Sequence, residues 1–238
     1  IYSFLTLITY PFANKIIAPS KLSTKILQKN FLLKKKITHI YNPINIKKIL
    51  ELSNAKFVPK ILEQNKHNQI IISIGRLTWE KDYITLINSF DHVTKKIKNV
   101  ILIILGDGKD KDYLRDFIYK KKLQDKIFLL GNVDNPYVYL KNCDLYVLHS
   151  ISELFPTSLV ESLVFNTNIL STNCDYGPSE ILENGKWGHL TPVKNSKLMT
   201  DNIINLISNN NKRNNNLKRA HDFDLEVSMK RYIKLIEG

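Results

Sequence analysis

The chain has 238 residues, of which 43% are hydrophobic and 24% charged, and this composition is ordinary for a soluble globular protein. At this length we expect one full domain with a hydrophobic core, plus part of another. Lys and Arg outnumber Asp and Glu by 35 − 22 = 13, and neither a transmembrane helix nor an intact secretory signal is visible.

The positive charge is uneven. Residues 1–50 contain nine Lys and no Asp or Glu, so this segment carries +9 and the rest of the chain only +4. Such asymmetry suggests a polyanionic partner, either nucleic acid or an anionic membrane surface. The alternative is genome bias, since the whole chain is rich in Lys, Asn and Ile. The sequence leaves both explanations open.

The first part of the chain predicts the end of one domain. It begins at Ile1, not Met, which indicates a fragment or a chain numbered from an internal residue. Two strands are predicted at 15–18 and 37–40, joined by a helix over 20–30. We therefore divide the chain into a remnant of an amino-terminal domain (1–43), a linker (44–69), a sheet domain (70–220) and a carboxyl-terminal helix (221–238).

From residue 70 onward, apolar runs alternate with stretches of helical periodicity. Five unbroken runs are predicted as strands, at 70–74, 100–105, 127–130, 145–148 and 168–171. Unbroken apolar runs suit strands that are covered on both faces. The fold class is therefore α/β, with a Rossmann-like parallel sheet and helices on both faces. In such a sheet, ligands bind outside the carboxyl ends of the strands.

Two carboxylates flank a predicted helix start beyond the fourth run. Pro156 predicts that the helix begins there, which leaves Glu153 on the preceding loop and Glu161 in the second turn. A helix start also exposes unpaired backbone N–H groups, here from Thr157, Ser158 and Leu159, that attract phosphate. A nucleotide-sugar matches this pattern, because one Glu can bind the sugar, the other the ribose, and the N–H groups the diphosphate. The alternative is that both are solvated partners of the helix dipole.

Arg76 and Lys81 follow the first strand of the sheet. A planar guanidinium beside a compact ammonium is suited to holding a diphosphate and to stabilising its charge as it leaves. Each residue taken alone is more often a surface charge. The sequence lacks a Gly-x-Gly-x-x-Gly after this strand and a P-loop, which argues against a dinucleotide cofactor and an NTPase.

No metal site is predicted. Asp110 and Asp112 have an Asp-x-Asp spacing, but they begin a helix, where acidic residues serve as caps. The histidines have no partner at ligand spacing. Cys143 and Cys174 also lack such spacing and are typical of free thiols in a reducing compartment, so we expect a cytoplasmic protein.

With these pieces in place, the chain resembles the carboxyl-terminal, donor-binding half of the retaining glycosyltransferases of family 4, or group 1, which have two Rossmann-like domains (GT-B type). The similarity covers roughly residues 70 to 195. The segments that carry it are Gly75-Arg76-Leu77, Glu80-Lys81, Ile104–Gly108, Leu130–Asn132, Ser150, Glu153–Pro156, Glu161 and Gly177–Leu182. Ile16–Ser20 and Ile40–Pro43 resemble the end of the amino-terminal domain of that family.

The resemblance implies a role for each matching position. Arg76 and Lys81 would bind the donor diphosphate, Glu153 the sugar and Glu161 the ribose, with Arg76, Lys81 and Glu153 as the catalytic set. No metal would be required, and the co-substrate would be a UDP- or GDP-sugar. The further donor-binding residues would be Gly75, Gly131, Val133, Phe155, Pro156, Thr157, Ser158 and Leu159, with Gly131 and Val133 along the base.

One departure concerns the loop between the two carboxylates. Leu154 occupies a position where the family usually has Gly. If that position needs a positive φ, the loop of this chain cannot easily take the same conformation.

We therefore expect a glycosyltransferase that uses a nucleotide-sugar donor and a lipid-linked, lipopolysaccharide or capsule-type acceptor, with retention. It would act in the cytoplasm or at the inner face of the cytoplasmic membrane, which residues 1–50 would contact. The alternative is a non-catalytic nucleotide-sugar-binding remnant, or one half of a split transferase that lacks its amino-terminal partner. A nucleic-acid-binding module ranks last, because the chain has no recognisable binding motif with interleaved aromatics.

Overall fold

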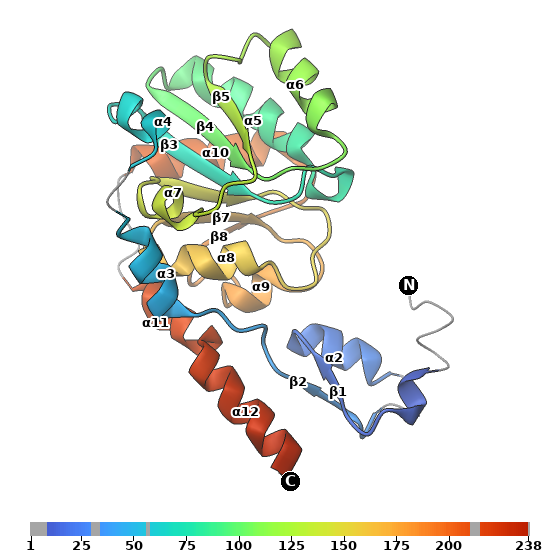
Figure 1. Cartoon of the computed structure of the whole chain (residues 1–238). Coiled ribbons are helices and arrows are strands. Elements are labelled where there is room, and N and C mark those ends of the chain that lie inside the picture. Colours follow the sequence, from blue (N-terminus) through green and yellow to red (C-terminus); the bar gives the residue numbers. More distant parts are fainter. Residues whose placement is uncertain (1–8, 30–33, 56–57, 210–214, 238) are drawn as a thin grey trace.

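A six-stranded parallel sheet forms the centre of the molecule (Figure 1), with the strand order β5-β4-β3-β6-β7-β8. The computed structural model describes residues 9–29, 34–55, 58–209 and 215–237. The strands are β3 (Gln69–Ile74), β4 (Val100–Leu105), β5 (Ile127–Gly131), β6 (Leu145–Leu148), β7 (Asn168–Thr172) and β8 (His189–Thr191). The chain order reverses between β3 and β6, which is the point where doubly wound sheets bind their ligands.

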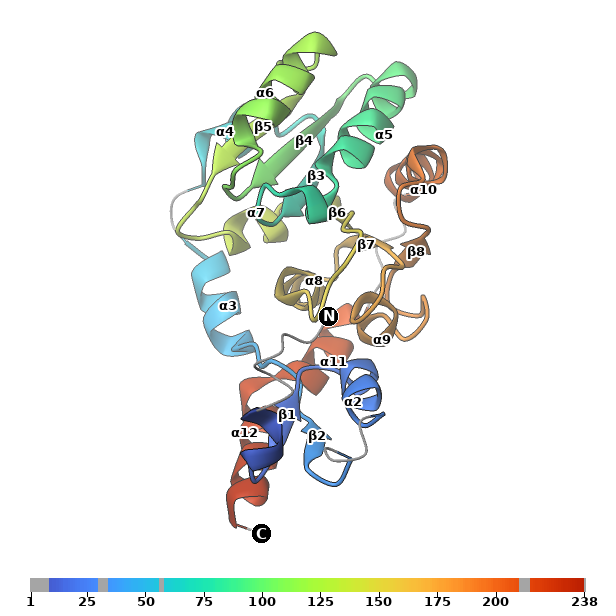
Figure 2. The ribbon, with the colours of Figure 1, turned by 90° about the vertical axis from the view of Figure 1, so that its right-hand side faces the viewer.

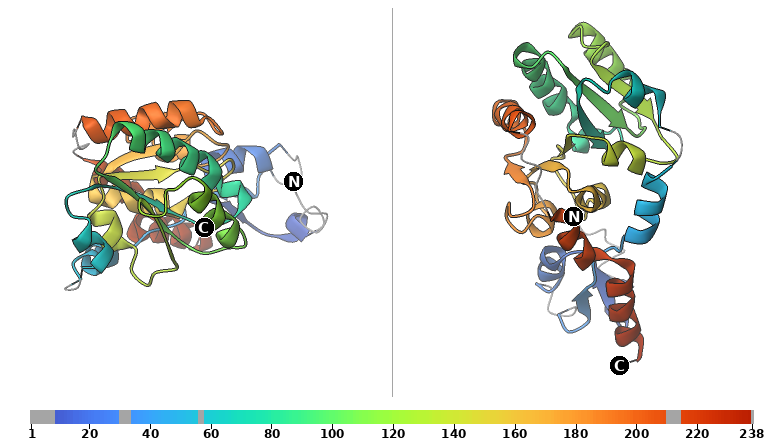
Figure 3. Two further views of the ribbon diagram at one scale, coloured as in Figure 1. Left: turned by 90° about the horizontal axis from the view of Figure 1, so that it is seen from above. Right: turned by 90° about the vertical axis from the view of Figure 1, so that its left-hand side faces the viewer.

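Helices cover both faces of this sheet, as two views show (Figure 3). One face is covered by α5 (Tyr83–Lys96), α6 (Lys111–Lys120) and α10 (Ser196–Ser208). The other face is covered by α3 (Ile46–Ser53), α4 (Lys60–Gln64), α7 (Tyr137–Lys141), α8 (Thr157–Ser162), α9 (Pro178–Ile181) and α11 (Asn216–Ala220). Each face has its own apolar core, which confirms the predicted fold class.

The five predicted strands of the sheet are confirmed, and one strand was missed. All six residues of β4 are buried, because helices pack against it from both sides. The missed strand, β8, is a three-residue edge strand beside β7, and only Thr191 in it is buried. A short edge strand without an apolar run has no signal in the sequence.

The amino-terminal segment forms a small unit beside the main sheet (Figure 2). The strands β1 (Ile16–Ala18) and β2 (Ile37–His39) pair in parallel, and α2 (Lys21–Leu27) connects them. Ser20 caps this helix with a side chain that accepts from the Ser23 N–H at 3.1 Å. These elements lie where the sequence predicts them.

Residues 44–69, which the sequence suggests as a linker, contain the helices α3 and α4. Ile46 and Ile49 of α3 are buried in the core of the main sheet. The carboxyl-terminal α12 (Leu225–Glu237) follows the short 3₁₀ helix η4 (His221–Phe223) and leaves the main sheet on the side of the small unit (Figure 1). The Ile44 N–H donates to the Phe223 carbonyl at 2.9 Å. The carboxyl-terminal segment is therefore hydrogen-bonded to the residues that follow β2. The predicted domain boundaries stay a prediction.

Glu180 of α9 connects the small unit to the main domain. Its carboxylate accepts from the backbone N–H of Lys21 at 3.0 Å and from that of Leu22 at 3.4 Å, both at the start of α2. The Tyr41 hydroxyl donates to the same carboxylate at 2.7 Å. A single side chain thus holds the first turn of α2 and the segment after β2.

Within the described residues, no helix combines the length and the apolar character that a membrane span requires.

Candidate active site

The turns that follow β3, β4 and β5 meet at one edge of the sheet, as predicted. The Gly75 N–H donates to the Leu105 carbonyl at 3.0 Å, and the Gly106 N–H donates to the Gly131 carbonyl at 2.7 Å. Gly106 has a φ of +132°, and a Cβ there would lie 2.0 Å from the Gly75 carbonyl oxygen. Only glycine allows this close approach, which brings the first two turns together.

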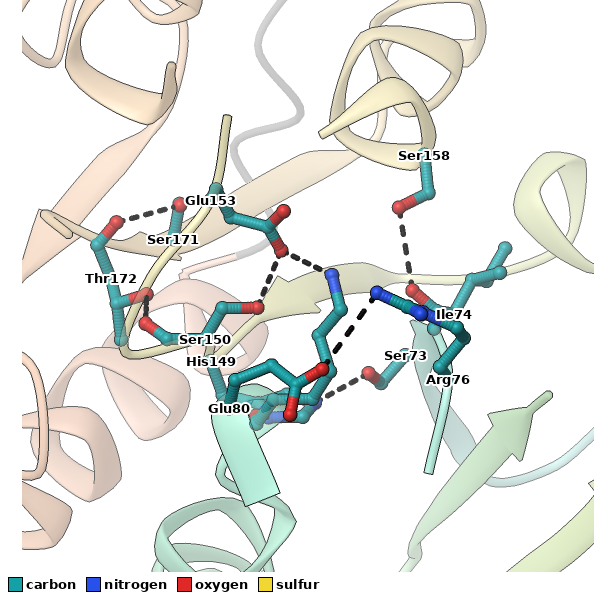
Figure 4. Close-up of polar contacts among 12 residues, drawn as sticks. Ser73, Ile74, Arg76, Glu80, His149, Ser150, Glu153, Ser158, Ser171 and Thr172 are labelled. Atoms are coloured by element: carbon teal, nitrogen blue, oxygen red, sulfur yellow. Dashed lines mark hydrogen bonds and ion pairs between the residues drawn. The ribbon is translucent and has the colours of Figure 1, made fainter. Parts of the chain in front are cut away.

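Lys81 and Glu153 form an ion pair at this edge, across the point where the strand order reverses. Lys81 ends the short 3₁₀ helix η2 (Trp79–Lys81), and Glu153 lies on the loop after β6. The distance from Lys81 Nζ to Glu153 Oε1 is 2.5 Å, and the two side chains are only 16% and 9% exposed. Ser150 donates to the same oxygen at 2.6 Å (Figure 4). Among the residues that the structure describes, no group donates to the other oxygen, Oε2.

Arg76 lies in a different environment from Lys81. Its side chain is 77% exposed, and its only ion pair in the described chain is with Glu80, at 3.7 Å (Figure 4). An exposed pair at this distance is weak. The guanidinium is therefore free to move toward a ligand, whereas the Lys81 ammonium is fixed by a nearly buried carboxylate.

The start of α8 offers fewer free N–H groups than predicted. Pro156 is the N-cap residue, so the helix begins at Thr157, one residue later than expected. The Leu159 N–H donates to the Pro156 carbonyl at 3.1 Å. The expectation of three unpaired groups is therefore corrected to two, those of Thr157 and Ser158, for which the described residues supply no backbone acceptor.

Side chains around this helix start fix it to the sheet. Ser158 Oγ lies 2.8 Å from the Tyr146 hydroxyl, and it donates to the carbonyl of Ile74 at the end of β3, at 3.3 Å. Phe155 is buried and stacks on Tyr41 with 5.6 Å between the ring centroids. Since its side chain is part of the core, Phe155 can meet a ligand only through its backbone.

Glu161 lies in the second turn of α8, as predicted, and it is paired with a tyrosine. The Tyr137 hydroxyl donates to Glu161 Oε1 at 3.1 Å. Burial raises the pKa of the Glu161 carboxyl, although the hydrogen bond from Tyr137 acts in the opposite direction. Burial, together with the nearby Glu161, also raises the pKa of Tyr137, to about 12. The surroundings therefore destabilise the ionised form of Glu161, and hydrogen bonds from ligand hydroxyls would stabilise that form.

Gly131 and Val133 lie at the end of β5 and just beyond it. Gly131 has a φ of +72°, and Val133 is half-buried against the core on the α7 side of the sheet. Both belong to the same edge as Lys81 and Glu153.

The loop between Glu153 and α8 has an ordinary backbone at Leu154. Leu154 is not among the described residues with a positive φ, so this position does not require glycine in this chain. The residue that does is Gly177, with a φ of +107°, where a Cβ would lie 2.7 Å from Pro156 Cδ. Because Gly177 has no side chain, the Pro156 ring can pack directly against its backbone.

The Asp-x-Asp pair is a surface feature, and its predicted capping role is only partly right. Asp110 occupies the N-cap position of α6 but makes no side-chain capping bond, and Asp112 pairs with Arg115 at 2.8 Å. In the described ranges, no cluster of three His, Cys, Asp or Glu side chains could hold a metal. Cys143 and Cys174 are buried, and neither forms a disulfide.

Three further residues contribute to the site. His149 and Ser150 follow β6 directly, and their position at the carboxyl end of a predicted strand could have identified them as site residues. No sequence pattern could have identified Tyr137, because it lies 24 residues before its partner Glu161. A pocket of about 690 Å³ lies at the opposite end of β3, beside Gln69 and Asp144.

Comparison with known proteins shows that this chain is similar to glycosyltransferases. The chain is 34% identical to an uncharacterised glycosyltransferase of Methanocaldococcus jannaschii, over 96% of this chain and 64% of that protein. It is 30% identical to the N-acetylgalactosamine-N,N'-diacetylbacillosaminyl-diphospho-undecaprenol 4-alpha-N-acetylgalactosaminyltransferase of Campylobacter jejuni, over 93% of this chain and 59% of the enzyme. The chain thus spans about two thirds or less of these relatives.

The fold is also that of solved glycosyltransferase structures. The crystal structure of the Anabaena HepE protein in complex with UDP-glucose superposes with a TM-score of 0.83 and 22% identity, covering 98% of this chain and 66% of HepE. Residues 54–222 match the family described as glycosyl transferases group 1. This match covers well over half of the sequence, and the chain belongs to that family.

Proposed function

We propose that this chain binds the nucleotide-sugar donor of a glycosyltransferase at the edge formed by β3, β6 and the start of α8. The observation that carries the proposal is the nearly buried Lys81–Glu153 ion pair at the carboxyl ends of a parallel sheet. The loop that carries Glu153 leads into α8, whose Thr157 and Ser158 N–H groups have no backbone acceptor among the described residues. A cation, a carboxylate and free N–H groups in one place match a sugar joined to a diphosphate.

The diphosphate would lie between Lys81 and the start of α8. An ammonium has three N–H donors, so Lys81 can keep Glu153 and still donate to a phosphate oxygen. Arg76 would leave its weak pair with Glu80 and close on the diphosphate from the solvent side. These charges would stabilise the leaving nucleoside diphosphate without a metal ion.

The two carboxylates would bind the hydroxyls on either side of the diphosphate. Glu153 would accept from the sugar through Oε2, while Glu161 would accept from the ribose. The backbone of Phe155, Pro156 and Leu159 would shape the site, with Gly75 beneath the diphosphate. Gly131 and Val133 would line the base. We also propose that transfer retains the configuration of the sugar, as the family resemblance implies.

The relatives support a UDP-sugar donor and a lipid-linked acceptor. HepE was crystallised with UDP-glucose, and the name of the Campylobacter enzyme gives a diphospho-undecaprenol acceptor. An acceptor of this kind lies at a membrane, and the Lys-rich residues 1–50 would favour contact with its anionic cytoplasmic face. Donor binding and membrane contact would thus involve different parts of the chain.

Calorimetry with UDP and UDP-glucose tests the assignment. Glu161→Gln should weaken both ligands, because both contain the ribose, whereas Glu153→Gln should weaken mainly UDP-glucose. Each loss should be about tenfold or more, as for a hydrogen bond to a charged group. Asp112→Asn, at an exposed carboxylate away from the site, is the control. Added EDTA should change nothing. Equal losses for both ligands in both variants would contradict the division of roles.

A further inference from the structure

His149 is a buried histidine at the centre of the site. It is the first residue after β6 and is only 3% exposed. Its Nε2 atom lies 2.7 Å from Ser73 Oγ near the end of β3 (Figure 4). Its Nδ1 atom contacts the backbone carbonyl of Lys81. The ring of Tyr83 packs against the imidazole, with 4.4 Å between the centroids. Three elements therefore meet on this one side chain.

The partners of His149 determine its proton. A carbonyl can only accept, so Nδ1 carries the hydrogen and donates to Lys81. Nε2 is then the acceptor for the Ser73 hydroxyl. Burial lowers the pKa of His149 to about 3, which keeps the ring neutral at physiological pH. In this neutral tautomer, both ring nitrogens are satisfied.

The same contact connects the two halves of the ion pair. The carbonyl that His149 holds belongs to Lys81 itself, whose ammonium binds Glu153. His149 in turn begins the loop that contains Ser150 and Glu153. A second bond joins the same segments, from the Ile151 N–H to the Glu80 carbonyl at 2.9 Å. The His149 bond acts on Lys81 more directly than the Ile151 bond, because it holds the backbone of Lys81 itself and not that of Glu80.

We propose that His149 is a positioning residue that holds the Lys81 backbone so that its ammonium meets Glu153 and the donor diphosphate. The contact with Glu153 is a feature of the protein alone, whereas the consequence for the diphosphate rests on the proposed function. His149 need not touch the ligand or exchange a proton with it.

Two substitutions separate this role from general packing. In His149→Asn, the side-chain amide can take the place of Nδ1 and still donate to Lys81. In His149→Gln, the longer amide takes the place of Nε2, reaches Ser73 and leaves the Lys81 carbonyl without its donor. Both put a polar amide in the same buried space, so both should lower the unfolding midpoint. Only His149→Gln should loosen Lys81.

The first readout is the coupling between Lys81 and Glu153, measured by urea unfolding of Lys81→Ala, Glu153→Gln and the double variant. The coupling should be retained in the His149→Asn background and largely lost in the His149→Gln background. If His149→Gln does not fold, His149→Phe replaces it, since its ring fills the buried space and has no donor for the Lys81 carbonyl. Full coupling in the His149→Gln background, or in its His149→Phe replacement, would overturn the proposal.

The second readout is the affinity for UDP. His149→Gln should weaken it about tenfold and His149→Asn by no more than about twofold, and His149→Gln should have no further effect once Lys81 is alanine. Additive losses would mean that His149 does not act through Lys81, and would overturn the proposal. A lost ion-pair coupling with unchanged UDP affinity would support the positioning role and contradict the diphosphate assignment of Lys81.

Discussion

The two cations of the site should differ sharply in what they contribute to stability. Lys81→Ala leaves Glu153, which is 9% exposed, without its cation at 2.5 Å. At an effective dielectric constant of about 20, the attraction at that distance is about 6 to 7 kcal/mol, and desolvation offsets much of it. Removing the cation should therefore destabilise the protein by about 2 to 4 kcal/mol. Arg76→Ala, at a side chain that is 77% exposed, should cost less than about 0.5 kcal/mol.

Urea unfolding at pH 7 and low salt measures both values, with the slope of the transition checked for equality. Lys81→Met combined with Glu153→Gln should recover most of the stability, because the buried charge is then removed with its partner. Equal stability of Lys81→Ala and Arg76→Ala would mean that the Lys81–Glu153 pair is not desolvated, contrary to the expected difference.

Three other substitutions have distinct expected outcomes. A raised pKa means that the unfolded state loses its proton first, so ionised Glu161 destabilises the fold increasingly as the pH rises above 4.5. Glu161→Gln should raise the unfolding midpoint in thermal scans at pH 7, and this gain should disappear below pH 4.5. Gly177→Ala should destabilise by about 1 to 3 kcal/mol in urea, because its φ is +107° and its Cβ would meet Pro156. Glu180→Gln should speed hydrogen exchange in α2 and β2 while β3 and β4 stay protected; unchanged exchange would contradict its role as the connection.

The sequence predicted the sheet well because its strands are covered on both faces. The runs at 100–105 and 145–148 are buried throughout, so an apolar run and a strand coincide. The helices of the segment 44–69 were missed, since α4 is a five-residue helix within a polar stretch. Burial of Phe155 against Tyr41 depends on tertiary packing and has no local pattern.

The site was predictable as a set of residues, but its contacts were not. Glu161 lies where helical spacing from Pro156 puts it. The Lys81–Glu153 contact joins residues 72 positions apart, and the His149–Lys81 contact joins residues 68 apart. Such pairings depend on the strand order, which brings β3 and β6 together at the reversal point. The ligands bound by these residues stay a prediction.

A crystal structure of this chain with UDP-glucose would show where the donor binds. The diphosphate should lie within hydrogen-bond distance of Lys81 and of the Thr157 and Ser158 N–H groups, with the ribose on Glu161. A nucleotide bound elsewhere, such as in the cavity of about 690 Å³ at the opposite end of β3, would contradict it.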